Sequence, residues 1–313
     1  MKKISIMVPA HNEQESLPLL YEAICSEMSS ERMSGYEWEL LLVNDGSADA
    51  TLDVMKSLRA SDPRVCYVDL SRNFGKENAM LAGFDYVTGD CCIVMDADLQ
   101  DPPAVIPQMV AKWEEGYDDV YAKRVSRGKE PWLKKKMSLL FYRILNSMSK
   151  VEMLQNVGDF RLLDRKCVEA LRNLREKERY TKGLFCWIGY RKAEVQFDRG
   201  DRIAGTTSWN FKSLARLAID GIVSFTTAPL HIATWVGLAV SLLAFLYMLF
   251  ILVKTIIFGD PVAGFPTLIC VILLLGGFQL LCIGIIGEYV ARMYNETKGR
   301  PVYIAREYNG ELL

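Results

Sequence analysis

Two aspartates spaced two residues apart carry the strongest chemical signal in this sequence. Asp96 and Asp98 follow a short apolar run, Cys91 to Met95, that is typical of a buried β-strand. Carboxylate oxygens at a strand end can hold a hard divalent cation, and Mg²⁺ is commonly bound through one or two carboxylates together with substrate phosphates. The plain alternative is a pair of solvated aspartates in the loop before a helix that starts at Pro102-Pro103. The pair predicts a metal-assisted phosphate site.

Three further polar clusters also come directly after apolar runs. They are His11-Asn12-Glu13, Asn44-Asp45-Gly46-Ser47 and Ser71-Arg72-Asn73-Phe74-Gly75. Each of them alone could be a turn or a helix cap. Ligands of parallel α/β sheets bind beyond the carboxyl ends of the strands, so four clusters at one edge predict a ligand site there. The sequence contains neither G-x-G-x-x-G nor G-x-x-x-x-G-K-[ST], which removes the main support for a dinucleotide-binding dehydrogenase or a P-loop enzyme.

The elements that must position these clusters alternate between β-type and helical patterns. The expected strands are Ile4 to Val8, Trp38 to Asn44, Val65 to Leu70, Cys91 to Met95 and Val120 to Tyr121. The expected helices are Glu15 to Met28, Thr51 to Ala60, Lys76 to Tyr86 and Pro102 to Glu115. This alternation predicts an α/β fold with a Rossmann-like, doubly wound, mostly parallel sheet.

Composition narrows the chemistry that such a site could perform. The 37 Lys and Arg residues nearly balance the 38 Asp and Glu residues, which gives no global electrostatic case for nucleic acid as a partner. His11 and His231 are the only histidines, so a histidine base or a His-rich metal site has little to use. The eight cysteines form no C-x-x-C pair and are interpreted as reduced packing residues. The chemistry should rest on carboxylates and arginines.

Two long uncharged segments predict a membrane-spanning hairpin. Residues 232–253 carry no charge, and at about 1.5 Å rise per residue a helix of that length covers the roughly 30 Å hydrocarbon layer. Residues 261–287 form a second such stretch, interrupted mainly by Gln279. Two buried helices of a soluble protein are the alternative interpretation. The lipid bilayer is therefore an expected partner.

Charges around the hairpin predict its orientation. Lys254 and Asp260 lie between the two uncharged segments. Several other basic residues lie before the first segment or after the second. These flanking residues are Lys212, Arg216, Arg292, Lys298, Arg300 and Arg306. The positive-inside bias places the N-terminal domain and both termini in the cytoplasm of a multi-pass plasma-membrane protein. Residues 210–228 have the spacing of an interfacial amphipathic helix, or of an ordinary helix packed on the preceding domain.

The polar clusters together resemble a known enzyme family. Val8-Pro9-Ala10-His11-Asn12-Glu13, Asn44-Asp45-Gly46-Ser47 and Asp96-Ala97-Asp98-Leu99-Gln100-Asp101-Pro102-Pro103 are similar to the motifs of the inverting family 2 glycosyltransferases, which have a GT-A fold. Within that family the chain resembles the polyprenyl-phosphate glycosyltransferases, which include bactoprenol glucosyltransferases and dolichyl-phosphate mannose synthases. The closer match extends through residues 156–165, 201–205, 217–222 and 286–303.

The resemblance implies a role for each cluster. The residues expected to bind the nucleotide sugar are Pro9, His11, Glu13, Val43, Asp45, Asp96, Ala97, Asp98, Arg124 and Arg202. Asp96 and Asp98, with Gln100, would hold Mg²⁺ or Mn²⁺ and the diphosphate. Relatives often carry a lysine directly before the tryptophan of the Gly-x-Ser-Lys-Trp stretch, whereas here Ser208 precedes Trp209.

The acceptor in such enzymes is a lipid phosphate, and two sites are candidates for handling it. Asp159 would position the acceptor or act as a base, and Arg161 would hold its phosphate. Arg124 and Arg127 begin a basic segment, 124–143, that could attract the lipid phosphate or form a solvated helix face.

The expected protein is thus an inverting, metal-dependent hexosyltransferase that moves glucose from UDP-glucose to undecaprenyl or another polyprenyl phosphate. Its expected domains are a GT-A catalytic domain over 1–209, the interfacial helix over 210–228, the transmembrane hairpin over 229–290 and a cytoplasmic tail over 291–313. A homo-oligomer is expected. The alternatives are transfer of N-acetylglucosamine, galactose or mannose, a polysaccharide synthase, and a membrane-tethered nucleotide-sugar-binding scaffold without catalysis.

Overall fold

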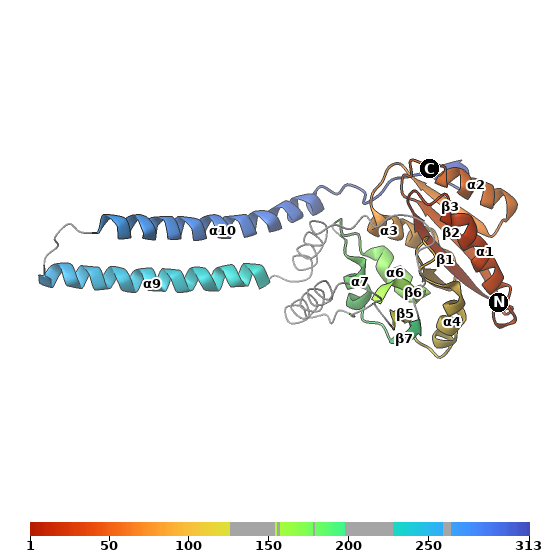
Figure 1. Cartoon of the computed structure of the whole chain (residues 1–313), viewed down its shortest axis with the longest axis horizontal. Helices are drawn as coiled ribbons and strands as arrows, with labels where there is room; N and C mark the ends of the chain where they lie inside the picture. The colour runs from red at the N-terminus through yellow and green to blue at the C-terminus, as the bar shows by residue number, and fades with distance from the viewer. Residues whose placement is uncertain (126–153, 155–156, 178, 198–227, 259–263) are drawn as a thin grey trace. The chain divides into compact units, whose positions relative to one another are not determined.

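The chain is divided into two compact units (Figure 1). The computed structural model describes residues 1–125, 154, 157–177, 179–197, 228–258 and 264–313. The first unit comprises Met1–Ala218 together with Pro301–Leu313, and the second comprises Ile219–Arg300. The predicted interfacial helix over 210–228 lies outside the described residues except for Ala228, the first residue of α9.

A single mixed sheet forms the centre of the first unit. Its described strands are β1 (Lys2–Ala10), β2 (Tyr36–Asn44), β3 (Val65–Leu70), β4 (Cys91–Val94), β5 (Asp119–Arg124), β6 (Val157–Asp164), β7 (Lys192–Phe197), β8 (Ala305–Tyr308) and β9 (Glu311–Leu312). They lie in the order β7-β5-β6-β4-β1-β2-β3-β8-β9. The four central strands β4, β1, β2 and β3 are parallel, as the alternating sequence pattern predicts. The flanks differ, because β6 runs antiparallel to both β4 and β5, and β8 runs antiparallel to β3.

Helices cover both faces of the central strands. They are α1 (Ser16–Met28), α2 (Thr51–Ser61), α3 (Lys76–Tyr86), α4 (Ile106–Glu114), α6 (Arg165–Asn173) and α7 (Thr181–Trp187), with 3₁₀ turns η1 (Glu31–Met33) and η2 (Pro103–Val105). Ile6 of β1 belongs to the same buried core as Leu20 of α1. Met7 points to the other face, where a Cβ on Gly83 of α3 would lie 2.5 Å from its Cγ. Burial on both sides explains why β1 is apolar on both faces from Ile4 to Ala10, with Ser5 as the one polar residue.

The second unit is a pair of long helices, α9 (Ala228–Phe258) and α10 (Phe265–Thr297). Within the described residues, Leu274–Thr297 is long and apolar enough to cross a membrane, with a mean hydropathy of 1.7. A shorter apolar stretch, Ala233–Tyr247, lies on α9. Large apolar side chains such as Trp235 and Leu280 are about 70% exposed. Exposed apolar surface of this extent is typical of a protein or membrane contact.

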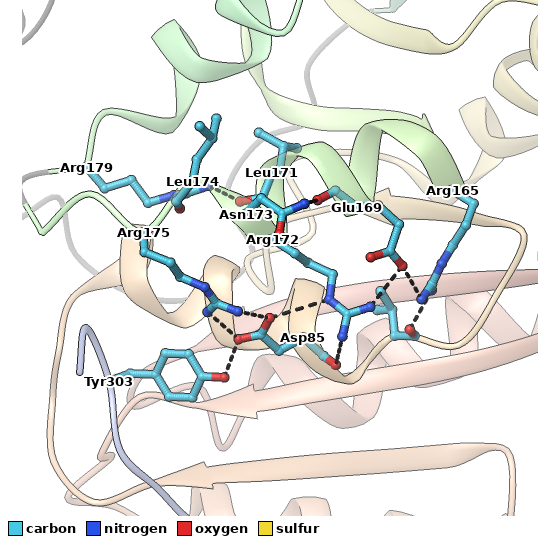
Figure 2. A network of polar contacts seen from close by, with 11 residues as sticks. Asp85, Arg165, Glu169, Leu171, Arg172, Asn173, Leu174, Arg175, Arg179 and Tyr303 are labelled. Atoms are coloured by element: carbon cyan, nitrogen blue, oxygen red, sulfur yellow. Dashed lines mark hydrogen bonds and ion pairs between the residues drawn. The ribbon is translucent and has the colours of Figure 1, made fainter.

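The segment after α10 returns to the sheet of the first unit. β8 pairs with β3, and the backbone N–H of Ser71 donates to the carbonyl oxygen of Ile304 at 2.9 Å. Figure 2 shows a second anchor, in which the Tyr303 hydroxyl donates to the Asp85 carboxylate at 2.5 Å and Arg175 donates two hydrogen bonds of 2.7 Å to the same group. Sequence reasoning assigned residues 291–313 to a tail and did not predict these strands.

Candidate active site

The loops after β1 and β2 are hydrogen-bonded to each other at the carboxyl edge of the sheet. A ring nitrogen of His11, Nδ1, lies 2.9 Å from the carbonyl oxygen of Asp45. The N–H of Asn12 donates to Ser47 Oγ at 3.0 Å, and the N–H of Ala48 donates to Asn12 Oδ1 at 2.8 Å. The two clusters therefore form one polar surface, at the edge where a ligand of a parallel sheet is expected.

The loop after β3 joins this surface through Asp45. This carboxylate is buried and accepts hydrogen bonds from the N–H groups of Phe74 and Gly75, at 2.7 and 2.9 Å. Gly46 has φ of +62°, and a Cβ there would lie 2.3 Å from the backbone carbon of Arg72. Only glycine allows the two loops to approach so closely. Asp45 thus organises the loops, and its predicted contact with the nucleotide stays a prediction.

Lys76 connects the aspartate pair to Asp159. Its ammonium lies 2.6 Å from a carboxylate oxygen of Asp96 and 2.6 Å from one of Asp159. Lys76 is the first residue of α3, Asp96 follows β4, and Asp159 lies on β6, so three distant parts of the chain meet at one cation. The structure therefore brings together the two acidic regions that sequence reasoning assigned to donor and acceptor.

The environment of Asp159 keeps its carboxylate ionised. Burial opposes ionisation, but the positive charges of Lys76 and Lys182 outweigh it and hold the pKa of Asp159 below its usual range. Burial likewise opposes the charge on Lys76, and the carboxylates of Asp159 and Asp96 raise its pKa above the usual range. Asp159 Oδ1 is buried and has no hydrogen-bond partner among the described residues. The side chain therefore retains an acceptor atom for another group.

Arg161 lies two residues further along β6 and has a different environment. Its side chain is 2% exposed, and its guanidinium makes hydrogen bonds of 3.1 and 3.2 Å to the carboxylate of Asp119, which is fully buried. The guanidinium carbon also lies 3.7 Å from the ring centre of Phe185. The expected contact between Arg161 and the acceptor phosphate is not favoured by this placement. Within the described residues the side chain joins β5, β6 and α7.

The segment from Asp96 to Gln100 forms a tight turn after β4. Ala97 is buried, Leu99 has φ of +58°, and the N–H of Gln100 donates to Asp98 Oδ1 at 3.2 Å. No group of three or more His, Cys, Asp or Glu side chains suited to a metal ion occurs in the described part of the chain. Two carboxylates alone can serve where substrate phosphates complete the coordination. The oxygen donors of Asp96 and Asp98 are of the type that Mg²⁺ and Mn²⁺ prefer.

The remaining predicted binding residues lie in different surroundings. Pro9 and Val43 are buried neighbours in the register of β1 and β2. Glu13 accepts a hydrogen bond of 2.5 Å from Ser16 Oγ. Arg124 ends β5, and its Nη2 would lie 3.2 Å from a Cβ on Gly158, directly beside Asp159. Arg127 and Arg202 lie outside the described residues.

Sequence reasoning missed the two lysines of this site. Lys76 and Lys182 lie near the N-terminal ends of α3 and α7, where the helix dipole disfavours a positive charge. A nearby anion offsets this unfavourable placement, and the placement is the signal that could have singled out Lys76.

Comparison with family models gives two matches. Residues 5–172 match the model described as Glycosyl transferase family 2, and residues 228–293 match the one described as GtrB C-terminal hairpin. The second match, together with the apolar surface of α10, indicates that the hairpin unit associates with a membrane.

Several curated relatives match nearly the whole chain. An uncharacterized glycosyltransferase of Synechocystis sp. is 44% identical over 98% of this chain and 96% of the relative. The bactoprenol glucosyl transferase of Shigella phage SfX is 43% identical over 97% of this chain and 99% of the relative. Among solved structures, glucosyl-3-phosphoglycerate synthase from Mycobacterium tuberculosis aligns with a TM-score of 0.47 at 17% identity, covering 71% of this chain and 78% of that one.

Proposed function

The chain belongs to glycosyl transferase family 2, and from this premise we propose that it transfers glucose from UDP-glucose to a polyprenyl phosphate, with undecaprenyl phosphate as the expected carrier. One observation carries the choice of glucose and of the lipid carrier, namely 43% identity over 97% of the chain to a protein named bactoprenol glucosyl transferase. The similarity extends over both units, so it includes the sheet edge and the hairpin alike.

The donor site is proposed at the carboxyl edge of the sheet, over the loops that follow β1, β2 and β4. Asp96 and Asp98, with Gln100, would hold Mg²⁺ or Mn²⁺, and their oxygen donors fit either ion. The ion would supply positive charge that stabilises the leaving diphosphate. Asp96 already accommodates the ammonium of Lys76, which supports its ability to hold a cation.

The acceptor is proposed to react as an ionised phosphate. A phosphate monoester has a second pKa near about 6, so a phosphate oxygen is available as nucleophile at neutral pH. That oxygen forms the new bond to the anomeric carbon while the bond from this carbon to UDP breaks, and a single displacement inverts the configuration. Asp159, whose pKa is held low, is a poor base, and a positioning role for it is proposed together with Lys76.

The hairpin is proposed to cross the membrane twice, with the catalytic domain and both termini in the cytoplasm. β7 precedes the hairpin and β8 follows it, and both strands belong to the same sheet. An even number of crossings satisfies that connectivity, and the basic flanks favour the cytoplasmic side. Protease cleavage sites added at Met1 and Leu313 should both be cut by external protease in inside-out vesicles and be protected in right-side-out ones. The homo-oligomeric state and the tail boundary at 291 stay predictions.

The direct test is transfer of labelled sugar by the purified full-length chain in detergent. UDP-glucose, UDP-N-acetylglucosamine, UDP-galactose and GDP-mannose are each incubated with undecaprenyl phosphate, and label in the lipid fraction is measured. We expect label from UDP-glucose, loss of transfer with EDTA, and recovery with Mg²⁺ or Mn²⁺. Asp98→Ala should abolish transfer, while Asp53→Ala, which removes an exposed carboxylate from α2, should not.

Each alternative function predicts a different result in this assay. Label from another donor alone would change the sugar but keep the reaction. A scaffold would bind a nucleotide sugar without labelling any lipid, and a polysaccharide synthase would label a polymer. Folded protein that labels no lipid from any donor would refute the proposal.

A further inference from the structure

We propose that Arg306, in the segment after the hairpin, is a positioning residue for the donor site and acts through Asp69 and Asn44. The inference rests on the proposed function, because it concerns the nucleotide-sugar half of that site. None of these three side chains belongs to the predicted binding residues. Arg306 lies on β8, Asp69 on β3 and Asn44 at the end of β2.

Asp69 is the centre of the connection. Its side chain is fully buried, and its two oxygens have different partners. Arg306 Nε donates to Oδ2 at 2.7 Å, and Nη2 of the same guanidinium donates to that oxygen as well. Asn44 Nδ2 donates to Oδ1 at 2.7 Å. One carboxylate therefore joins the C-terminal strand to the last residue of β2.

Asn44 passes the connection to the loops of the donor site. Its side chain is buried, and its Oδ1 accepts a hydrogen bond of 3.2 Å from the N–H of Ser47. Ser47 Oγ in turn accepts a hydrogen bond of 3.0 Å from the N–H of Asn12. Both polar atoms of the Asn44 amide are thus engaged, so a shift of Asp69 would change the turn that follows β2 and its contact with the loop after β1.

The guanidinium of Arg306 contributes more to balancing the charge of Asp69 than to holding the C-terminal segment on the sheet. Its side chain is 55% exposed, so its packing contribution is small. The segment has other anchors, among them the hydrogen bond from Tyr303 to Asp85 and the ion pair of 3.2 Å between Lys56 and Glu307. Loss of Arg306 would leave the segment docked but the buried carboxylate of Asp69 without its cation.

The test compares Arg306→Gln with Lys56→Gln in the full-length protein. The control removes the neighbouring ion pair of the same strand without touching Asp69. We expect Arg306→Gln to raise the KM for UDP-glucose about fivefold or more, at an unchanged KM for undecaprenyl phosphate. Hydrogen exchange of the Ser47 amide should become faster in the same variant. Arg306→Lys should restore part of both, and Lys56→Gln should resemble the wild type.

A second background keeps the test decisive if Arg306→Gln folds poorly. Asp69→Asn keeps an acceptor for Asn44 and leaves no buried charge, so adding Arg306→Gln to it should change the KM for UDP-glucose no further. A further increase of the KM for UDP-glucose in the Asp69→Asn background, or equal effects of Arg306→Gln and Lys56→Gln, would overturn this inference and leave the proposed function untouched. A folded wild type that labels no lipid would overturn the proposed function, and the positioning role with it.

Discussion

Replacement of Lys76 by methionine tests the central ion cluster of the candidate site. The substitution keeps an unbranched side chain at the start of α3 and removes the ammonium that lies 2.6 Å from both Asp96 and Asp159. Asp159 is only 8% exposed, so its carboxylate would lose its closest cation while still buried. We expect the variant to be less stable than the wild type at neutral pH.

The size of the effect follows from the exposure of the two partners. Removing one member of a fully buried ion pair costs about 3–5 kcal/mol. The Lys76 side chain is 43% exposed, so water screens the pair and we take about 2 kcal/mol as the expected loss. For a domain of this size that loss corresponds to roughly 4–8 °C in the midpoint of thermal unfolding.

The assay is thermal unfolding in detergent as a function of pH. The folded pKa of Asp159 is lowered, so the stabilisation from the pair is present above the unfolded pKa of about 3.9 and is lost as the pH falls through the lowered folded pKa. In Lys76→Met the positive charge that offsets the effect of burial is gone, so the pKa of Asp159 rises. The deficit in midpoint should therefore be largest at neutral pH and narrow as the pH falls.

A double-mutant cycle with Asp159→Asn separates the ion pair from other effects of the methionine. The neutral amide needs no cation, so Lys76→Met should cost much less in that background. Lys112→Met is the control, because it removes an exposed ion pair between α4 and Glu115, the residue after the helix, and should leave the thermal midpoint unchanged. If Lys76→Met behaved like this control, or lost as much stability in the Asp159→Asn background as in the wild type, the reasoning would be refuted.

Two further substitutions test the loop contact and the buried arginine. Gly46→Ala, with a left-handed φ and a backbone atom of Arg72 in the way, should lower the thermal midpoint by several degrees, whereas Gly35→Ala, which has open space, should not. Arg161→Met should lose about 3 kcal/mol by removing both hydrogen bonds to the buried Asp119 and leaving it only the Lys192 ammonium at 4.0 Å, and Asp119→Asn should recover most of that loss in denaturation experiments.

The central part of the fold could be predicted because its signals are local. Apolar runs over β1 to β4 are each followed by a polar cluster, and the structure confirms these strands within two residues at each end. β6 was missed, although residues 156–165 had been noted as a motif. Its antiparallel place between β4 and β5 is set by pairing with strands that lie far away in the sequence. No local pattern distinguishes that arrangement from continued parallel order.

The sequence pattern predicts which residue types lie at this edge of the sheet, but it does not predict how they pair. Asp96 and Asp159 were both singled out, but the lysine between them comes from a helix 83 residues before Asp159. Arg161 has the type and position expected of a phosphate ligand, and only the structure pairs it with Asp119 on the neighbouring strand. A charged residue near a ligand site can thus serve the ligand or the sheet, and the contact of Arg161 with the acceptor phosphate stays a prediction.

The position of β8 changes how the hairpin should be regarded. The chain reaches β8 only after α9 and α10, yet β8 covers the edge strand β3 and supplies the cation that faces Asp69. A catalytic domain that ended before the hairpin would expose that edge and leave Asp69 without Arg306. Such a truncation could therefore lose activity because the loops of the donor site, after β1 and β2, are no longer held in place. The separate contribution of the membrane to acceptor binding must be measured in chains that keep residues 301–313.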